Sequence, residues 1–163
     1  MKPFEKDKRW SDIFIPRIAE LIAPALLVPA PFEEDAERNT DLIVLKMDSI
    51  RIGCRIRKYE YIERYGGEFT IRSGRPSGAK TELTKIIEGW GDMFFYGFSN
   101  ETETDLDKWF LGDMNVFRLW FNRYMAEHQG RIPGTGRNNT DNSSDFRVFK
   151  LIELPPQFIV RSS

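Results

Sequence analysis

Cysteine and histidine are nearly absent from this chain of 163 residues, which contains one of each. The single cysteine, Cys54, excludes an internal disulfide, a zinc cluster of cysteines and a CxxC redox pair. The single histidine, His128, leaves too few imidazoles for a zinc enzyme built on histidine ligands. We therefore expect any chemistry to come from Asp, Glu, Lys, Arg, Ser, Thr or Tyr side chains.

Long apolar segments are also absent. No apolar run approaches the roughly 18 residues that are needed to span a bilayer. The first ten residues, MKPFEKDKRW, lack the apolar core of a secretory signal. We therefore expect no membrane partner and a reducing, cytoplasmic location.

No charge dominates the whole chain, whose net charge is −1, but the charges are unevenly distributed. Residues 51–80 contain eight Lys or Arg against three Glu, whereas residues 31–48 and 88–113 are acidic. A basic segment between two acidic ones favours a local surface that faces an anion. In the alternative interpretation, the three segments neutralise one another in the fold.

The pattern of elements predicts one α/β domain over residues 1–163, with a mixed central sheet flanked by helices. Apolar residues at helical spacing predict a helix over residues 11–28. Residues 1–10 are expected to form an N-terminal tail, and the composition of residues 130–145 indicates a flexible loop. Further elements are expected as a helix over 81–89, a strand over 92–99, a helix after Asp113 and a strand over 146–154.

Three strands are predicted between residues 41 and 73, and we expect them to lie side by side. Residues 41–47 are nearly all apolar, which suits a central strand. Residues 49–59 and 68–73 alternate, so that each has an apolar face and a polar one. The alternation places Cys54 in the core and exposes a face of arginines for phosphates, made up of Arg51, Arg55, Arg57 and Arg72.

Carboxylates near the ends of these elements suggest a metal site. Glu20 lies in the first helix, Asp41 opens the first strand and Glu68 opens the third. Carboxylates at strand ends bind Mg²⁺, which prefers oxygen ligands. Glu82 and Lys85 follow one helical turn apart, and a lysine beside a metal stabilises charge that develops on a phosphate.

Residues 11–99 resemble the PD-(D/E)XK nuclease superfamily, which has the restriction-endonuclease-like fold. The segment TDLIVL looks like the family's PD strand, with Asp41 as the metal-binding aspartate, and CRIR falls where the family has its acid-x-lysine pair. The strings EFTIRS, TELTKI and FFYGF are similar to those of nuclease-like proteins of phages and mobile elements. For a phage-encoded chain, the expected location is the host cytoplasm.

The chain departs from the family pattern at that pair, where Arg55 replaces the acid and Arg57 the lysine. Three interpretations stay open: Glu68 replaces the missing acid, the site is inactive, or Asp41 and Arg55 form an ion pair across a hairpin. For the active site, the resemblance implies a nuclease that depends on Mg²⁺. Asp41 and Glu68 would bind the metal with help from Glu20, and Arg57 or Lys85 would stabilise the phosphate.

The alternative function, from another class, is an inactive binding module. It would use the face of arginines to bind nucleic acid or an acidic protein partner, for example as a phage-encoded inhibitor.

Overall fold

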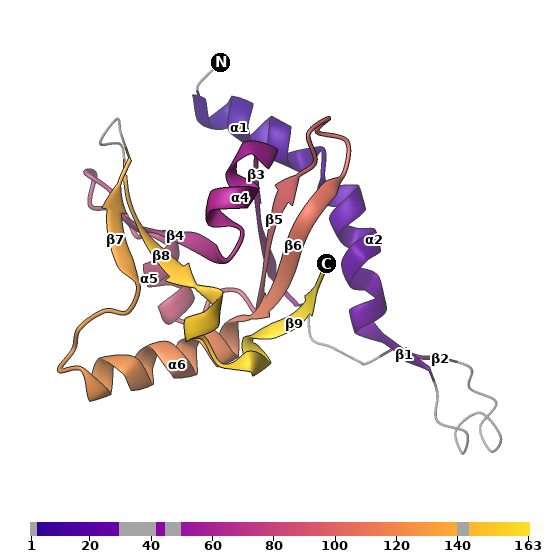
Figure 1. Cartoon of the computed structure of the whole chain (residues 1–163). Helices are drawn as coiled ribbons and strands as arrows, with labels where there is room; N and C mark the ends of the chain where they lie inside the picture. The colour runs from indigo at the N-terminus through magenta and orange to yellow at the C-terminus, as the bar shows by residue number, and fades with distance from the viewer. Residues whose placement is uncertain (1–2, 30–41, 45–49, 140–143) are drawn as a thin grey trace, which may run out of the picture. The chain divides into compact units, whose positions relative to one another are not determined.

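Residues 3–29, 42–44, 50–139 and 144–163 are described by the structure, which is a computed structural model. The contacts within the chain divide it into two compact units, Met1–Ile50 and Arg51–Ser163. The prediction of a single domain over residues 1–163 stays a prediction. The expected mixture of helices with a mixed sheet is confirmed (Figure 1). Among the described residues, no helix is both long and apolar enough to cross a membrane.

The first unit consists of two helices and a short two-stranded sheet. Helix α1 spans Pro3–Asp12 and α2 spans Ile15–Leu26, and strand β1 (Leu27–Pro29) pairs antiparallel with β2 (Leu42–Val44). The predicted helix over 11–28 is therefore correct in its centre but broken by a turn at residues 13–14.

The prediction of an N-terminal tail over residues 1–10 is wrong, because α1 begins at Pro3. Lys8 and Asp12 form an ion pair four residues apart, which suits a helix. At the end of α1 the ring of Trp10 packs edge-on against Phe14, with 5.3 Å between the ring centroids. These contacts stabilise the helix, although the polar composition of the segment suggested a tail.

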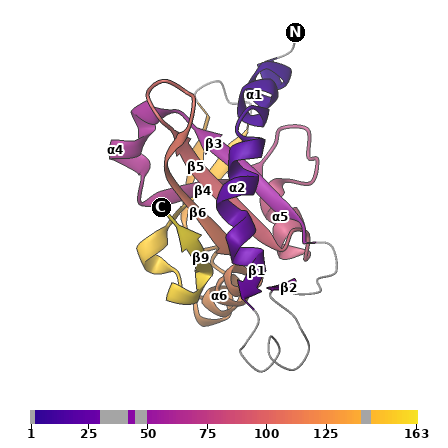
Figure 2. The same cartoon turned by 90° about the vertical axis from the view of Figure 1, so that its right-hand side faces the viewer.

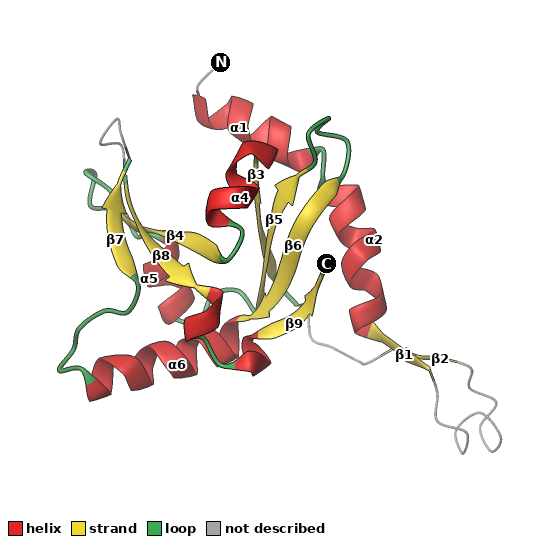
Figure 3. Cartoon of the chain, viewed as in Figure 1, coloured by secondary structure: helices red, strands yellow, loops and turns green. Residues whose placement is uncertain are grey.

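The second unit contains two sheets, which Figure 3 distinguishes from the helices by colour. The four-stranded sheet has the order β3-β5-β6-β9, in which β3 pairs parallel with β5 and the other neighbours are antiparallel. The three-stranded antiparallel sheet has the order β4-β8-β7. The strand bounds are β3 Ile52–Arg57, β4 Glu68–Gly74, β5 Met93–Ser99, β6 Leu106–Asp113, β7 Thr135–Asn138, β8 Asp145–Lys150 and β9 Ile159–Ser162.

The helices of this unit are mostly short. They are η1 Tyr59–Tyr61, α4 Ile62–Tyr65, α5 Glu82–Ile87, η2 Leu151–Glu153, η3 Pro156–Phe158 and the longer α6 Met114–Glu127. Figure 2 shows α6 nearly end-on. The predicted cap is confirmed, since the side chain of Asp113 accepts hydrogen bonds from the backbone N–H groups of Asn115 and Val116.

The prediction that residues 41–73 form three adjacent strands is wrong. Strand β2 pairs with β1, β3 pairs with β5, and β4 pairs with β8 in the other sheet. The predicted apolar face of β4 is buried at Phe69 and Ile71, but in β3 Ile56 is the one buried residue. Cys54, however, is exposed. Alternation reveals which face of a strand is apolar, but it carries no information on which strand lies beside it.

Residues 130–145 also differ from the predicted flexible loop, because β7 lies within them and pairs with β8. The guanidinium of Arg147 donates hydrogen bonds to the backbone carbonyls of Ile132, Pro133 and Gly134. This side chain from β8 holds the segment that leads into β7. The glycine- and asparagine-rich composition is thus compatible with a strand, because pairing with β8 satisfies the backbone of β7 and Arg147 satisfies the carbonyls just before it.

Aromatic rings form the core of the second unit, and Phe69 lies at its centre. Its ring centroid lies 5.4 to 6.2 Å from six other aromatic rings, which come from both sheets, α6 and η3: Phe94, Tyr96, Phe110, Phe117, Phe149 and Phe158. Gly112 leaves room for this packing, since a Cβ there would lie 2.4 Å from the ring of Phe158. The core therefore joins the two sheets of the unit through β4.

Candidate functional site: a cationic cleft

A cleft of about 350 Å³ opens in the second unit between the edge strands β3 and β4 and helix α5. Its walls carry five cationic side chains and one carboxylate, which come from β3, β4, α5 and the segment before α5: Arg55, Arg72, Arg75, Lys80, Lys85 and Glu82. We call this the cationic cleft. Its floor is apolar and includes Ile86, Phe94 and Met114.

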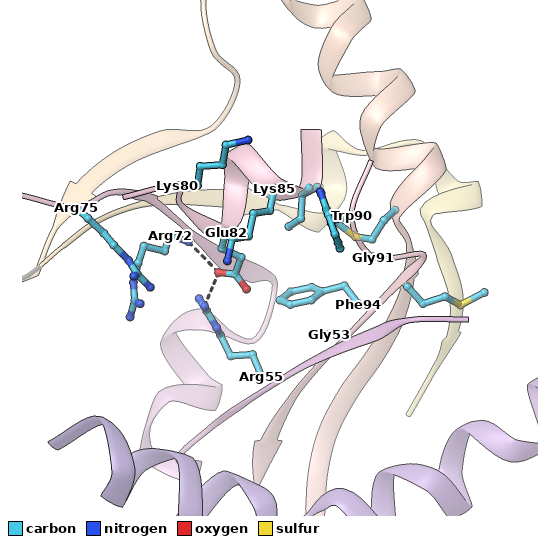
Figure 4. A pocket seen from close by; sticks show the side chains of 13 residues that line it. Gly53, Arg55, Arg72, Arg75, Lys80, Glu82, Lys85, Trp90, Gly91 and Phe94 are labelled. Atoms are coloured by element: carbon cyan, nitrogen blue, oxygen red, sulfur yellow. Dashed lines mark hydrogen bonds and ion pairs between the residues drawn. The ribbon is translucent and has the colours of Figure 1, made fainter. Parts of the chain in front are cut away.

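Glu82 joins the elements that build the cationic cleft. Thr81 caps α5 by accepting a hydrogen bond from the backbone N–H of Thr84, so that Glu82 is the first residue of the helix. One oxygen of Glu82 accepts hydrogen bonds from Arg55 Nη2 of β3 at 2.5 Å and from the backbone N–H of Arg72 in β4 at 3.1 Å. The carboxylate thus fixes α5 against an edge strand of each sheet (Figure 4).

Arg55 is fully engaged inside the protein. Its other terminal nitrogen, Nη1, donates to the backbone carbonyl of Thr70 at 2.7 Å and to the Thr70 hydroxyl at 3.2 Å. That hydroxyl lies 3.4 Å from the hydroxyl of Tyr96. Tyr96 is the residue of β5 that lies opposite Arg55 in β3. A half-buried arginine that is bound by a carboxylate and a carbonyl mainly connects β3 to β4 and α5. Only the rest of its surface faces the cleft.

Three cations of the cleft have free side chains. Among the described residues, the side chains of Arg72, Arg75 and Lys85 have no hydrogen-bond or ion-pair partner. Lys80 differs, because it forms an ion pair with Glu88 at 2.8 Å, and Figure 4 shows its amino end directed away from Glu82. The free positive charge of the cleft therefore belongs to Arg72, Arg75 and Lys85.

The positive charges are close enough to affect one another. Partial burial, followed by the neighbouring charges of Arg75 and Arg55, lowers the pKa of the Arg72 guanidinium below its ordinary value, against a smaller opposing effect of Glu82. Like charges that gather in a cleft raise the local concentration of anions. The arrangement suits an anionic ligand, and guanidinium groups match the geometry of phosphate in particular.

Of the cations that the sequence singles out, the structure brings three together. Arg55, Arg72 and Lys85 line the cationic cleft. Arg57 lies elsewhere, with its guanidinium 5.1 Å from the ring centroid of Tyr61, and Arg51 is exposed outside the cleft. The predicted face of four arginines is thus divided: Arg55 and Arg72 line the cleft, whereas Arg51 and Arg57 do not.

Of the three carboxylates predicted to bind a metal, two lie among the described residues, and they belong to different units. Asp41 lies outside the described residues, and Glu20 belongs to the first unit, where it pairs with Arg17 at 3.0 Å. Glu68 opens β4 opposite Lys150 and does not line the cleft. In the part of the chain that the structure describes, no three His, Cys, Asp or Glu side chains are grouped to hold a metal ion. The Mg²⁺ site stays a prediction.

Two features of the site were not predicted from the sequence. One of the interpretations left open paired Arg55 with Asp41, which lies outside the described residues, whereas the structure pairs Arg55 with Glu82. Trp90 also lines the cleft, and 63% of it is exposed. Its signal in the sequence was its position between Gly89 and Gly91, since a large aromatic residue between two glycines is unusual for a core position.

Comparison with known proteins adds no family to this description: no protein-family model, curated protein or solved structure matches the chain.

Proposed function

We propose that the second unit binds the phosphate backbone of nucleic acid in the cationic cleft. The observation that carries the proposal is the presence in one cleft of three cations, Arg72, Arg75 and Lys85, whose side chains form no hydrogen bond or ion pair among the described residues. Two of them are arginines, whose planar donors suit phosphate oxygens. The function that this supports is the binding module, with nucleic acid as the partner rather than an acidic protein.

A polyanion explains the free charges better than an internal role does. Glu82 already neutralises Arg55, and Glu88 neutralises Lys80, so the fold supplies anions where it needs them. The remaining cations repel one another, and a ligand that carries phosphates relieves this repulsion when it binds.

The test is a binding titration with fluorescent oligonucleotides, followed by anisotropy at several salt concentrations. Replacing Arg72 and Arg75 together by Gln should weaken binding by about tenfold or more. It should also lower the dependence of log Kd on log salt by about 0.7 to 0.9 for each phosphate contact that is lost. The matched control replaces Arg123 and Arg131, two exposed arginines outside the cleft, by Gln.

The double variant and its control lose the same charge, so a general attraction of the surface would weaken both equally. Equal affinity in the two variants, or binding that neither changes, would contradict the proposal. Catalysis stays a prediction, because Asp41 lies outside the described residues, and so does the restriction-endonuclease-like fold, because no solved structure matches the chain. The same titrations, run with Mg²⁺ and with chelator, show whether the bound strand is cleaved and whether Asp41→Asn stops it.

A further inference from the structure

Trp90 is the most exposed large aromatic side chain of the described residues, and it lines the cationic cleft. Gly89 and Gly91 on either side of it have φ values of 100° and 80°, in the left-handed region. Side chains other than glycine adopt such angles only with strain. The two glycines therefore turn the chain sharply and direct the indole outward, rather than into the aromatic core close by.

The backbone around Trp90 is held in place on both sides. The backbone N–H of Trp90 donates to the carbonyl of Lys85 at 3.0 Å, which continues the end of α5. From α6, Arg118 Nη1 donates to the carbonyls of Gly91 at 3.0 Å and Ile86 at 3.2 Å. The indole is thus exposed on a fixed segment, and a ligand that contacts it does not have to order a loose loop.

The cleft has two chemically different ends. Figure 4 shows Arg72 and Arg75 at one end and Trp90 at the other, with the ring of Phe94 below Trp90 in the view. Gly53 in β3 keeps this apolar part open, since a Cβ there would lie only 3.3 Å from the Phe94 ring. A ligand that satisfies both ends carries an anion at one end and a flat apolar group at the other.

A nucleotide with an unpaired base fits this description. Its phosphate suits the guanidinium groups, and its base has a face that stacks on an indole. In a duplex, both faces of a base are covered by its neighbours, so contact with Trp90 would require unstacking. An acidic peptide would satisfy the cations but leave the indole without a flat partner.

We propose that Trp90 stacks on an unpaired base beside the bound phosphate, so that the cationic cleft selects single-stranded over double-stranded nucleic acid. This inference rests on the proposed function, because it assumes that the arginine end of the cleft binds phosphate.

The experiment measures the Kd of the full chain for a short single strand, for the matching duplex and for an abasic strand of equal length. The unaltered protein should prefer the normal strand. Trp90→Ala should weaken binding to that strand by about five- to a hundredfold, leaving the duplex and the abasic strand unaffected. Trp90→Phe, which keeps an aromatic face, should retain most of the affinity.

The control is Tyr59→Ala, which removes another exposed aromatic ring outside the cleft and should leave all three affinities unchanged. Thermal unfolding of each variant confirms that it is folded. If Trp90→Ala weakens binding to strand and duplex equally, or if the unaltered protein prefers the duplex, the inference is wrong while phosphate binding stands. If the unaltered protein binds none of the three ligands, the proposed function itself fails.

Discussion

The aromatic core and the cationic cleft of the second unit share strands, but the core contains buried apolar side chains and the cleft is lined by charged ones. In β4, Phe69 and Ile71 are fully buried among apolar neighbours, whereas Thr70 contacts Arg55 and Arg72 lines the cleft. Alternate residues of one strand thus serve stability on one face and the cleft on the other. Single substitutions should therefore change the stability of the fold and the properties of the cleft separately.

The largest effect is expected at the centre of the core. Phe69→Ala removes the ring that contacts six others, and the cavity it leaves should lower the free energy of unfolding by about 3–5 kcal/mol. Urea denaturation measures this change. The control is Leu119→Ala on α6, where the side chain is 71% exposed, and a similar loss in both variants would contradict the description of the core.

An intermediate effect on stability is expected at Glu82, which lines the cleft and also connects α5 to β3 and β4. Glu82→Gln leaves Arg55 without its counter-charge, and because both side chains are mostly buried, the free energy of unfolding should fall by about 1–3 kcal/mol. In the matched variant, Glu88→Gln breaks the exposed pair with Lys80 and should cost no more than about 1 kcal/mol. Equal losses of unfolding free energy in the two variants, measured by urea denaturation, would show that Glu82 does not hold α5 against β3 and β4.

The smallest effect on stability is expected at Arg72. Since partial burial and then the neighbouring arginines disfavour its charge, Arg72→Gln should change the free energy of unfolding by less than about 0.5 kcal/mol, and the change should be a gain at low salt. Thermal unfolding with and without added NaCl measures this, and the stabilisation by salt should be smaller in the variant. A clear loss of stability would indicate that Arg72 supports the fold.

The same repulsion has a defined dependence on pH. A lowered pKa of a basic group means that the folded state disfavours the charged form, here through burial first and repulsion second, so this cost is present at all pH values below the folded pKa. It disappears only as the pH rises through that pKa, and an arginine stays protonated at neutral pH. Arg72 should therefore contribute no pH dependence to stability near neutral pH, and salt is the variable that reveals it.

Local patterns in the sequence were sufficient for several elements. The alternation in 49–59 indicated β3, and Asp113 marked the start of α6. The predicted helix over 81–89 contains α5, and the predicted strand over 92–99 contains β5. These features depend on side-chain spacing and capping within a few residues, which is information that the sequence contains directly.

The arrangement of these elements was decided only by the tertiary structure. Strand β3 pairs with β5 and β4 with β8, both across long stretches of chain, and these two edge strands bring Arg55 and Arg72 to one cleft. The ion pair of Arg55 with Glu82, 27 residues away, follows from the same arrangement. Pairing between distant segments depends on the packing of the whole core around Phe69, and no local pattern of charge or apolar residues encodes it.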